Sequence, residues 1–246
     1  MHSVAGREFS EFTRLAAVGD PYAPVPSCPG WAFVDLVRHV GRLHRWVAVI
    51  VGRMLGEAPR GRDIDDMIPD EPELMPAWQA RWTAELDAAL AAADPDAEVW
   101  TWGVDRRVRW WTRRMLHETT IHRVDAQLAF GETPRLGRDT AVDGVHELLY
   151  NLPAAVEFAP DIVKLTGAGE RLALHAADTG DWWRITFQPD GFVWTTGRGA
   201  PPEADALIRA AATDLYLRVW GRPPVGAVTE SGSPGLIRHW TINSAQ

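Results

Sequence analysis

Three ionisable side chains share the buried face of one predicted helix. The stretch from Val108 to Phe130 has helical periodicity, and one stripe along it contains Trp111, Met115, Glu118, His122, Asp125 and Ala129. Neighbours in this stripe are three or four positions apart, the spacing of a single helix face in a bundle. An unpartnered buried charge costs on the order of several kcal/mol, so Glu118, His122 and Asp125 require a compensating charge. A bound metal ion would supply it.

The neighbouring His117 resembles part of a zinc-protease signature but has the wrong spacing. The string from His117 to His122 is one residue longer than the HExxH motif. At about 100° per residue, Glu118 and His122 differ by roughly 40° and share a face, whereas His117 and His122 differ by roughly 140°. We therefore expect Glu118 and His122 to act together, and His117 to lie at the surface or rim of the bundle.

A third metal ligand is expected from the helix predicted between Trp31 and Leu55. The apolar stripe of this helix includes His39, whereas His44 lies off it. His39, Glu118 and His122 would offer two imidazoles and one carboxylate. This set suits zinc and, less selectively, iron, nickel or manganese.

Such a site would have an open coordination position. Three protein ligands leave room for a further ligand, which is typical of catalytic rather than structural zinc sites. Asp125, one turn after His122, would orient an imidazole from behind the ligands. The alternative interpretation is a core histidine whose hydrogen bonds are satisfied by a carboxylate.

The elements that position these side chains are helices over roughly the first 158 residues. Helical periodicity is found in five stretches, which are Val4 to Val18, Trp31 to Leu55, Glu73 to Ala93, Val108 to Phe130 and Arg138 to Val156. Turn signals with Pro and Gly separate them, and Gly131 is placed to cap the helix that ends at Phe130. This pattern predicts an up-and-down bundle of four or five antiparallel helices in residues 1–158.

The pattern changes after Pro160. Three short β-rich runs, Arg171 to Asp178, Asp181 to Gln188 and Phe192 to Gly197, are separated by Thr-Gly and Pro-Asp-Gly hairpin signals. A helix from about Pro202 to Trp220 and a last one near Pro234 to Trp240 are predicted next. We therefore expect an α+β chain, with a small α/β C-terminal domain over residues 159–246.

Composition excludes several classes of partner. The net charge of −8 and pI near 5.5 argue against nucleic acid. The longest apolar stretch is far short of the roughly 20 residues that span a bilayer, so no membrane partner is expected. The single cysteine, Cys28, points to a reducing compartment, and the first residues lack a signal-peptide pattern, so a cytoplasmic location is expected. Nothing in the sequence indicates an oligomeric state.

Three motifs together resemble a known family. They are Ser-Cys-Pro-Gly-Trp at 27–31, Asp-Leu-Val-Arg-His at 35–39, and the segment 117–125 with His-Glu and Ile-His-Arg-Val-Asp. In order and spacing they resemble the mycothiol-dependent maleylpyruvate isomerase family, and the likeness covers nearly the whole chain. It implies a DinB-like bundle followed by a domain reminiscent of sterol carrier proteins. It also implies that His39, Glu118 and His122 bind zinc.

The resemblance further implies an enzyme that uses a low-molecular-weight thiol, mycothiol. Its sulfur would occupy the open zinc position as thiolate and add to a small electrophile, giving either cis–trans isomerisation or S-transfer. The Trp-Gly-Arg string at 220–222 matches a family pattern, so Arg222 is the candidate for binding a substrate carboxylate; a surface arginine at a helix end is the alternative. Cys28 is expected to be a buried structural residue.

Two departures from the family leave the reaction open. The tail at 227–234 replaces an acidic Gly-Asp turn, and Trp100, Trp102, Trp110 and Trp111 add bulk near the metal-binding helix. A Trp-lined cavity would favour a larger or aromatic electrophile, whereas plain core packing is the alternative. Two other functions remain open: a metallohydrolase with zinc-activated water, and a non-catalytic protein that sequesters a small molecule.

Overall fold

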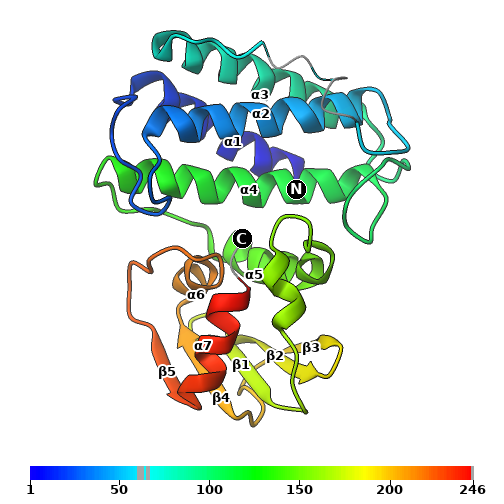
Figure 1. Cartoon of the computed structure of the whole chain (residues 1–246), viewed down its shortest axis with the longest axis vertical. Helices are drawn as coiled ribbons and strands as arrows, with labels where there is room; N and C mark the ends of the chain where they lie inside the picture. Colours follow the sequence, from blue (N-terminus) through cyan, green and yellow to red (C-terminus); the bar gives the residue numbers. More distant parts are fainter. Residues whose placement is uncertain (60–63, 65–66, 245–246) are drawn as a thin grey trace. The chain divides into compact units, whose positions relative to one another are not determined.

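The computed structural model describes residues 1–59, 64 and 67–244. The chain divides into two compact units, residues 1–134 and the residues from 135 onward (Figure 1). The division lies ahead of the boundary expected at residue 158. It does so because the helix that starts at Arg138 packs against a helix of the second unit instead of joining the bundle.

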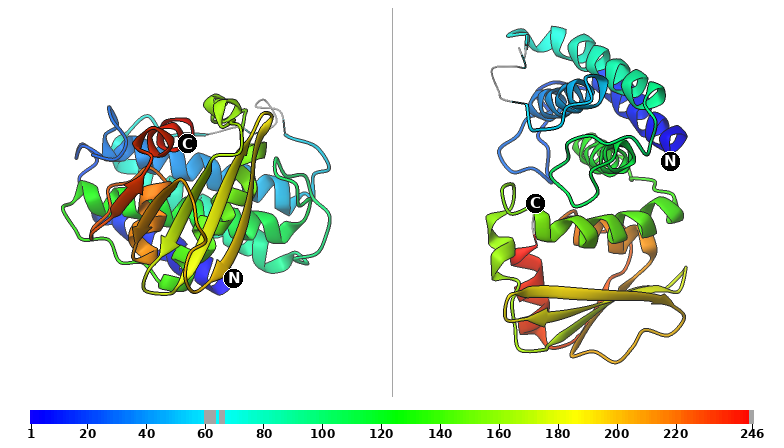
Figure 2. Two further views of the ribbon diagram at one scale, coloured as in Figure 1. Left: turned by 90° about the horizontal axis from the view of Figure 1, so that it is seen from below. Right: turned by 90° about the vertical axis from the view of Figure 1, so that its right-hand side faces the viewer.

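The first unit is a bundle of four helices. Their bounds are α1 His2–Val18, α2 Phe33–Gly52, α3 Met75–Ala92 and α4 Val108–Ala129, and the short 3-10 turn η2 Pro72–Leu74 precedes α3. α1 and α2 each pack against both α3 and α4 (Figures 1 and 2). The order around the bundle is therefore α1, α3, α2, α4. It differs from the sequential order that short loops alone would give, because the connection at 19–32 is long enough to cross the end of the bundle.

Local sequence determines where α2 and α4 begin and end. At the start of α2 the backbone N–H of Ala32 donates to Asp35 Oδ2 at 3.0 Å, an N-terminal cap that also places a negative charge on the first turn. α4 ends as predicted. Gly131 adopts φ 68°, and the N–H groups of Gly131 and Glu132 donate to the carbonyls of Leu128 and Gln127, a Schellman motif.

The second unit combines a mixed sheet with three helices. Its elements are α5 Arg138–Asn151, η3 Leu152–Ala154, η4 Pro160–Lys164, β1 Arg171–Ala176, β2 Asp181–Gln188, β3 Gly191–Arg198, β4 Ala206–Ala210, α6 Ala212–Val219, β5 Thr229–Gly232 and α7 Pro234–Asn243. The strand order is β3-β2-β1-β4-β5, and only the β1–β4 pair is parallel (Figure 2). The α+β class and the predicted β2–β3 hairpin at Pro-Asp-Gly are confirmed.

One predicted element is wrong. The helix expected from Pro202 to Trp220 is a strand followed by a shorter helix, because β4 pairs along its whole length with β1 and the helix starts only at Ala212. Strand β5 was also not predicted. In both strands, pairing with distant segments outweighs weak local propensity.

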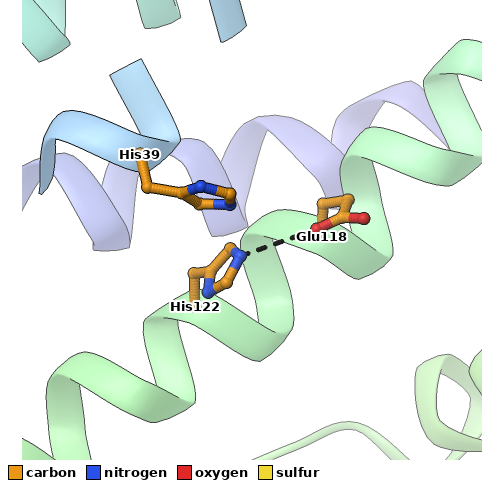
Figure 3. A group of neighbouring side chains, drawn as sticks. All are labelled: His39, Glu118 and His122. Atoms are coloured by element: carbon orange, nitrogen blue, oxygen red, sulfur yellow. Dashed lines mark ion pairs between the residues drawn. The ribbon is translucent and has the colours of Figure 1, made fainter. Parts of the chain in front are cut away.

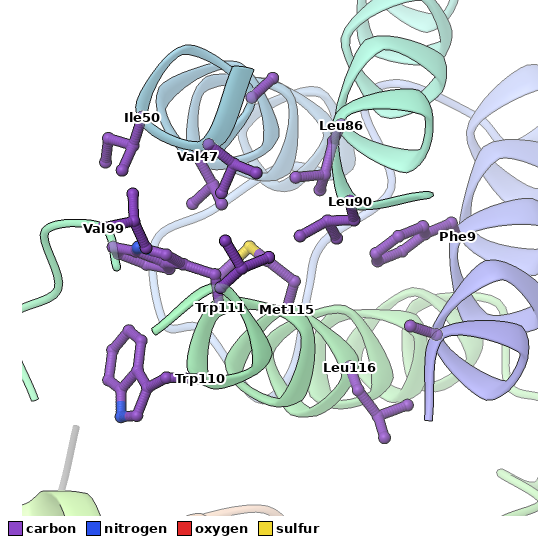
Figure 4. Close-up of a cluster of buried hydrophobic side chains, with 14 residues drawn as sticks. Phe9, Val47, Ile50, Leu86, Leu90, Val99, Trp110, Trp111, Met115 and Leu116 are labelled. Carbon is purple, nitrogen blue, oxygen red and sulfur yellow. The ribbon is translucent and has the colours of Figure 1, made fainter. Parts of the chain in front are cut away.

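Two apolar clusters fill the bundle, one toward each end. One contains Trp111, Met115 and Leu86 (Figure 4), and the other contains Phe12, Phe33 and Met75. Along α4 they use the segment 108–116 and residue Ala126 respectively. The segment 117–125 of α4, which contains most of the buried polar residues of this helix, therefore lies between the two apolar clusters. In the part of the chain that the structure describes, no helix is long and apolar enough to cross a bilayer.

Candidate metal centre

His39, Glu118 and His122 meet inside the first unit. His39 comes from α2, and the other two lie one turn apart on α4 (Figure 3). One ligand atom from each side chain lies within 4.8 Å of the others. His122 Nε2 is 3.6 Å from Glu118 Oε2, and the rings of His39 and His122 pack edge to face with centroids 4.7 Å apart. The structure therefore brings together the three residues that the sequence selected.

The three side chains of the cluster differ in exposure. His122 is buried, whereas His39 and Glu118 keep part of their surface exposed. The centroid of the Trp31 ring lies 5.3 Å from that of the His39 ring, so Trp31 limits the positions that this imidazole can adopt.

Asp125 lies behind His122, as expected for an orienting residue. Its side chain is fully buried, and its Oδ2 lies 3.0 Å from His122 Nδ1. A carboxylate only accepts hydrogen bonds, so Nδ1 carries a proton toward Asp125, and Nε2 is the ring nitrogen that faces Glu118. Ser27 Oγ donates to Asp125 Oδ1 at 2.6 Å, and Cys28 Sγ donates to Oδ2 at 3.7 Å. Asp125 thus ties the 27–31 turn to α4.

The charges around Glu118 keep it ionised. Burial by itself would raise the pKa of Glu118, but the charge of Arg114 and a hydrogen bond from His122 outweigh burial and lower that pKa well below its usual range. Burial also opposes the charged form of His122, yet its hydrogen bonds with Asp125 and Glu118 raise the pKa of the imidazole. The cluster therefore holds one ionised carboxylate that faces two imidazoles.

This donor set fits a divalent transition metal. Two imidazole nitrogens and one carboxylate oxygen on two helices match the ligand types of three-ligand zinc sites, and the Asp125–His122 hydrogen bond is the usual support of a metal-binding histidine. Of the described residues, only these three form a group of His, Cys, Asp or Glu close enough to share one ion.

His117 does not lie at the rim, which corrects the sequence expectation. Its side chain is fully buried, although it is not part of the ligand cluster. The reason is that buried residues occupy nearly every face of α4, so a single stripe does not describe this helix.

His44 is a buried polar residue that the sequence analysis placed off the core stripe. Its two ring nitrogens lie 2.8 Å from Thr83 Oγ1 and 2.9 Å from Thr119 Oγ1. Burial is the main reason why its pKa falls to about 3, so the ring is neutral at physiological pH. The signal was present in the sequence, because Val40 and Val47, four positions before and three after it, are both buried apolar residues.

The extra tryptophans pack mainly against one another. Trp110 and Trp111 are buried, and their rings meet edge to face at 4.7 Å. Trp46, Trp100 and Trp102 are partly buried. The rings of Trp46 and Trp100 pack against Trp111, and the ring of Trp102 packs against Trp110. This arrangement agrees with the core-packing alternative.

The remaining candidates differ in position from the expectation. Arg222 lies two residues after Trp220, the C-cap of α6, and Gly221 between them adopts φ 74°. Arg222 Nη1 donates to the Trp220 carbonyl at 2.8 Å. It therefore does not end a long helix, because α6 has only 8 residues. Cys28 is only partly buried and lies against Asp125.

Known families match both units. Residues 3–127 match the family described as "Mycothiol maleylpyruvate isomerase N-terminal domain", and residues 139–239 match "MDMPI C-terminal domain". The gap between the two matches contains the division between the compact units. Among curated proteins, no sequence matches the chain.

Two solved structures share the fold. One is the crystal structure of the mycothiol-dependent maleylpyruvate isomerase, with 19% sequence identity and a TM-score of 0.58. The other is a histidine-to-alanine mutant of that enzyme, with 18% identity and the same TM-score. Each alignment covers 94% of this chain and 92% of the other. The likeness therefore extends over both units.

Proposed function

Because the chain belongs to the mycothiol maleylpyruvate isomerase family, we propose that it is a metal-dependent enzyme that uses mycothiol to isomerise, or to add sulfur to, a small electrophile. The observation that carries the proposal is the convergence of His39, Glu118 and His122, whose ligand atoms lie within 4.8 Å of one another. Family membership by itself would not require these three side chains to meet.

In this proposal His39, Glu118 and His122 hold one divalent ion, with zinc favoured by the donor set. The bound ion would supply positive charge that stabilises the thiolate of mycothiol at neutral pH, where a free thiol is mostly protonated. The protein then needs no nucleophile of its own, which agrees with the contact of its single cysteine, Cys28, with Asp125.

The residues behind the ligands have an orienting role. Asp125 holds His122 Nδ1–H, so that Nε2 points toward the ion, and the Ser27 hydroxyl keeps the Asp125 carboxylate in place. Because these three groups are fixed by hydrogen bonds at 3.0 and 2.6 Å, the site is organised before any ligand binds.

The reaction would need only reversible addition to a conjugated alkene. When the thiolate adds, the C=C bond becomes a single bond and the electron pair moves into the conjugated carbonyl; after rotation, loss of the same thiolate restores the alkene as the other isomer. If the carbanion takes up a proton instead, the sulfur stays attached and the result is S-transfer. Arg222 is proposed to bind a carboxylate of the substrate through its planar guanidinium.

Metal content tests the proposal first. Protein purified without added metal is expected to hold about one zinc per chain, and the His39→Ala, His122→Ala double variant is expected to lose most of it, because a single remaining ligand holds an ion poorly. His117→Gln is the matched control on α4 and should keep its metal. Full occupancy in the double variant would contradict the assigned ligands.

Thiol binding then separates this proposal from its alternatives. In the cobalt-substituted protein, mycothiol is expected to produce a sulfur-to-metal charge-transfer band, with affinity that rises with pH as the thiol loses its proton. Turnover of maleylpyruvate should require the thiol. A cobalt spectrum that saturating mycothiol leaves unchanged would favour a hydrolase or a binding protein.

A further inference from the structure

Arg114 connects the ligand cluster to the tryptophan cluster. It lies one turn before Glu118 on α4, and its side chain is only 6% exposed. Its Nη2 donates to Glu118 Oε1, and its guanidinium carbon lies 5.2 Å from the centroid of the Trp102 ring. A guanidinium that is buried, paired and stacked on an aromatic ring has little freedom to move.

Because of this contact, the two carboxylate oxygens of Glu118 have different partners. Oε1 accepts from Arg114, whereas Oε2 faces His122 Nε2 at 3.6 Å. A carboxylate with both oxygens available can bind one ion with either one or both of them. A strong charge-assisted hydrogen bond to Oε1 leaves Oε2 as the oxygen that is presented to the histidines.

We propose that Arg114 is a positioning residue that makes Glu118 a ligand through Oε2 alone and thereby keeps the coordination number of the ion low. This inference rests on the metal site proposed above. It explains why a buried arginine lies on the same helix face as a ligand carboxylate. Apolar side chains of the same volume would fill the core without the cost of burying two charges.

The same contact changes the charge that the ion presents. The two imidazoles are neutral ligands, and the positive charge of Arg114 offsets the negative charge of Glu118. Glu118 therefore neutralises less of the charge of the ion, and more of that charge remains available to an anionic ligand such as a thiolate. Arg114 would thus leave both a coordination position and positive charge on the ion available to a ligand that binds from solution.

Two variants of Arg114 and one control test the proposal. Arg114→Met removes the hydrogen bond while keeping an apolar stem against Trp102, Arg114→Lys keeps the charge without the planar fork, and Arg113→Met removes a charge from the same turn of α4. Zinc affinity is measured by competition with a coloured chelator, and coordination by the visible spectrum of the cobalt-loaded protein. Circular dichroism and thermal melting verify that each variant folds.

We expect Arg114→Met to weaken zinc binding by about 10–100-fold, the usual effect of losing a group that orients a ligand. Its cobalt spectrum should weaken in the visible range as Glu118 binds through both oxygens and the coordination number rises. Arg114→Lys should lie between Arg114→Met and the wild type. Arg113→Met should match the wild type in affinity and spectrum.

Two results would overturn the role of Arg114. Tighter zinc binding by Arg114→Met would show that the arginine merely competes with the ion for Glu118. A lower melting temperature with wild-type affinity and spectrum would show that it only supports packing. Failure of the wild-type chain to bind zinc would instead refute the metal site itself, so the two failures are distinguishable.

Discussion

At the level of single residues, two ionisable groups in the middle of the bundle, Glu118 and His122, each have a partner of opposite charge. Glu118 has Arg114, and His122 has Asp125. His44, by contrast, is held by two hydroxyl groups and by no charge. This difference explains why the charged forms of Glu118 and His122 are favoured while His44 stays neutral.

The neutral His44 predicts an acid-sensitive fold. The pKa of His44 is about 3 in the folded protein against 6.5 for an unperturbed histidine, so between these values only the unfolded chain binds this proton. The free energy of unfolding should therefore decrease as pH falls below 6.5, by up to about 1.4 kcal/mol per pH unit. Above that range His44 contributes no pH dependence.

The His44→Gln variant isolates this contribution. Glutamine can still hydrogen-bond to Thr83 and Thr119 but does not titrate, so its unfolding free energy should decline less steeply between about pH 6 and pH 4. Urea denaturation of both metal-free proteins across this range measures the difference, because the other titrating groups are common to both. Parallel curves for the two proteins would contradict the proposed titration.

At the scale of elements, the α2–α3 contact determines how His39 and His44 face α4. Gly41 lies between these two histidines on α2, and a Cβ added there would lie 2.2 Å from the Trp78 ring of α3. The two helices can approach this closely only because position 41 has no side chain. The approach of α3 is also what brings Thr83 to His44.

Gly41→Ala is therefore expected to destabilise the bundle by about 1–3 kcal/mol, the cost of overpacking, although alanine favours the helix itself. Gly52→Ala is the matched control at the end of α2, where the nearest atom to an added Cβ is 3.9 Å away, and its stability should not fall. Thermal or urea denaturation of the two variants and of the wild type measures these differences in stability. Equal stability of Gly41→Ala and the wild type would mean that the Trp78 ring moves at little cost.

In the molecule as a whole, the family match spans two compact units, and the proposed chemistry assigns each a different task. The bundle carries the three ligands, and the second unit carries Arg222, half-buried after the cap of α6. The assignment predicts that metal binding and substrate binding can be lost separately.

Arg222→Ala should keep its zinc and still bind mycothiol, while turnover of a carboxylate substrate falls by roughly 10–150-fold, in line with the loss of a charge-assisted hydrogen bond. Arg222→Lys should recover part of the activity, because a point charge does not replace a planar fork. Arg198→Ala, on the exposed hairpin of the same unit, serves as the control. Wild-type turnover in Arg222→Ala would assign this arginine to the surface.

The features that depend on local geometry could be predicted from the order of the amino acids. The periodicity of α4 predicted that Glu118 and His122 share a face, because residues four apart on a helix always do. Gly131 predicted the end of α4, and the Pro-Asp-Gly signal predicted the β2–β3 turn, because both depend on the backbone freedom of single residues. The motifs at 27–31, 35–39 and 117–125 were enough to identify the family.

Which distant groups meet could not be predicted from local patterns, because it depends on how the helices and strands pack. That Ser27 binds Asp125, that His44 lies between Thr83 and Thr119, and that β4 forms a strand instead of extending a helix all depend on pairing between segments far apart in the chain. Burial of His117 likewise follows from packing on several faces of α4, which a single stripe cannot represent. Local propensities differ by only about 1 kcal/mol per residue, so long-range packing decides such cases.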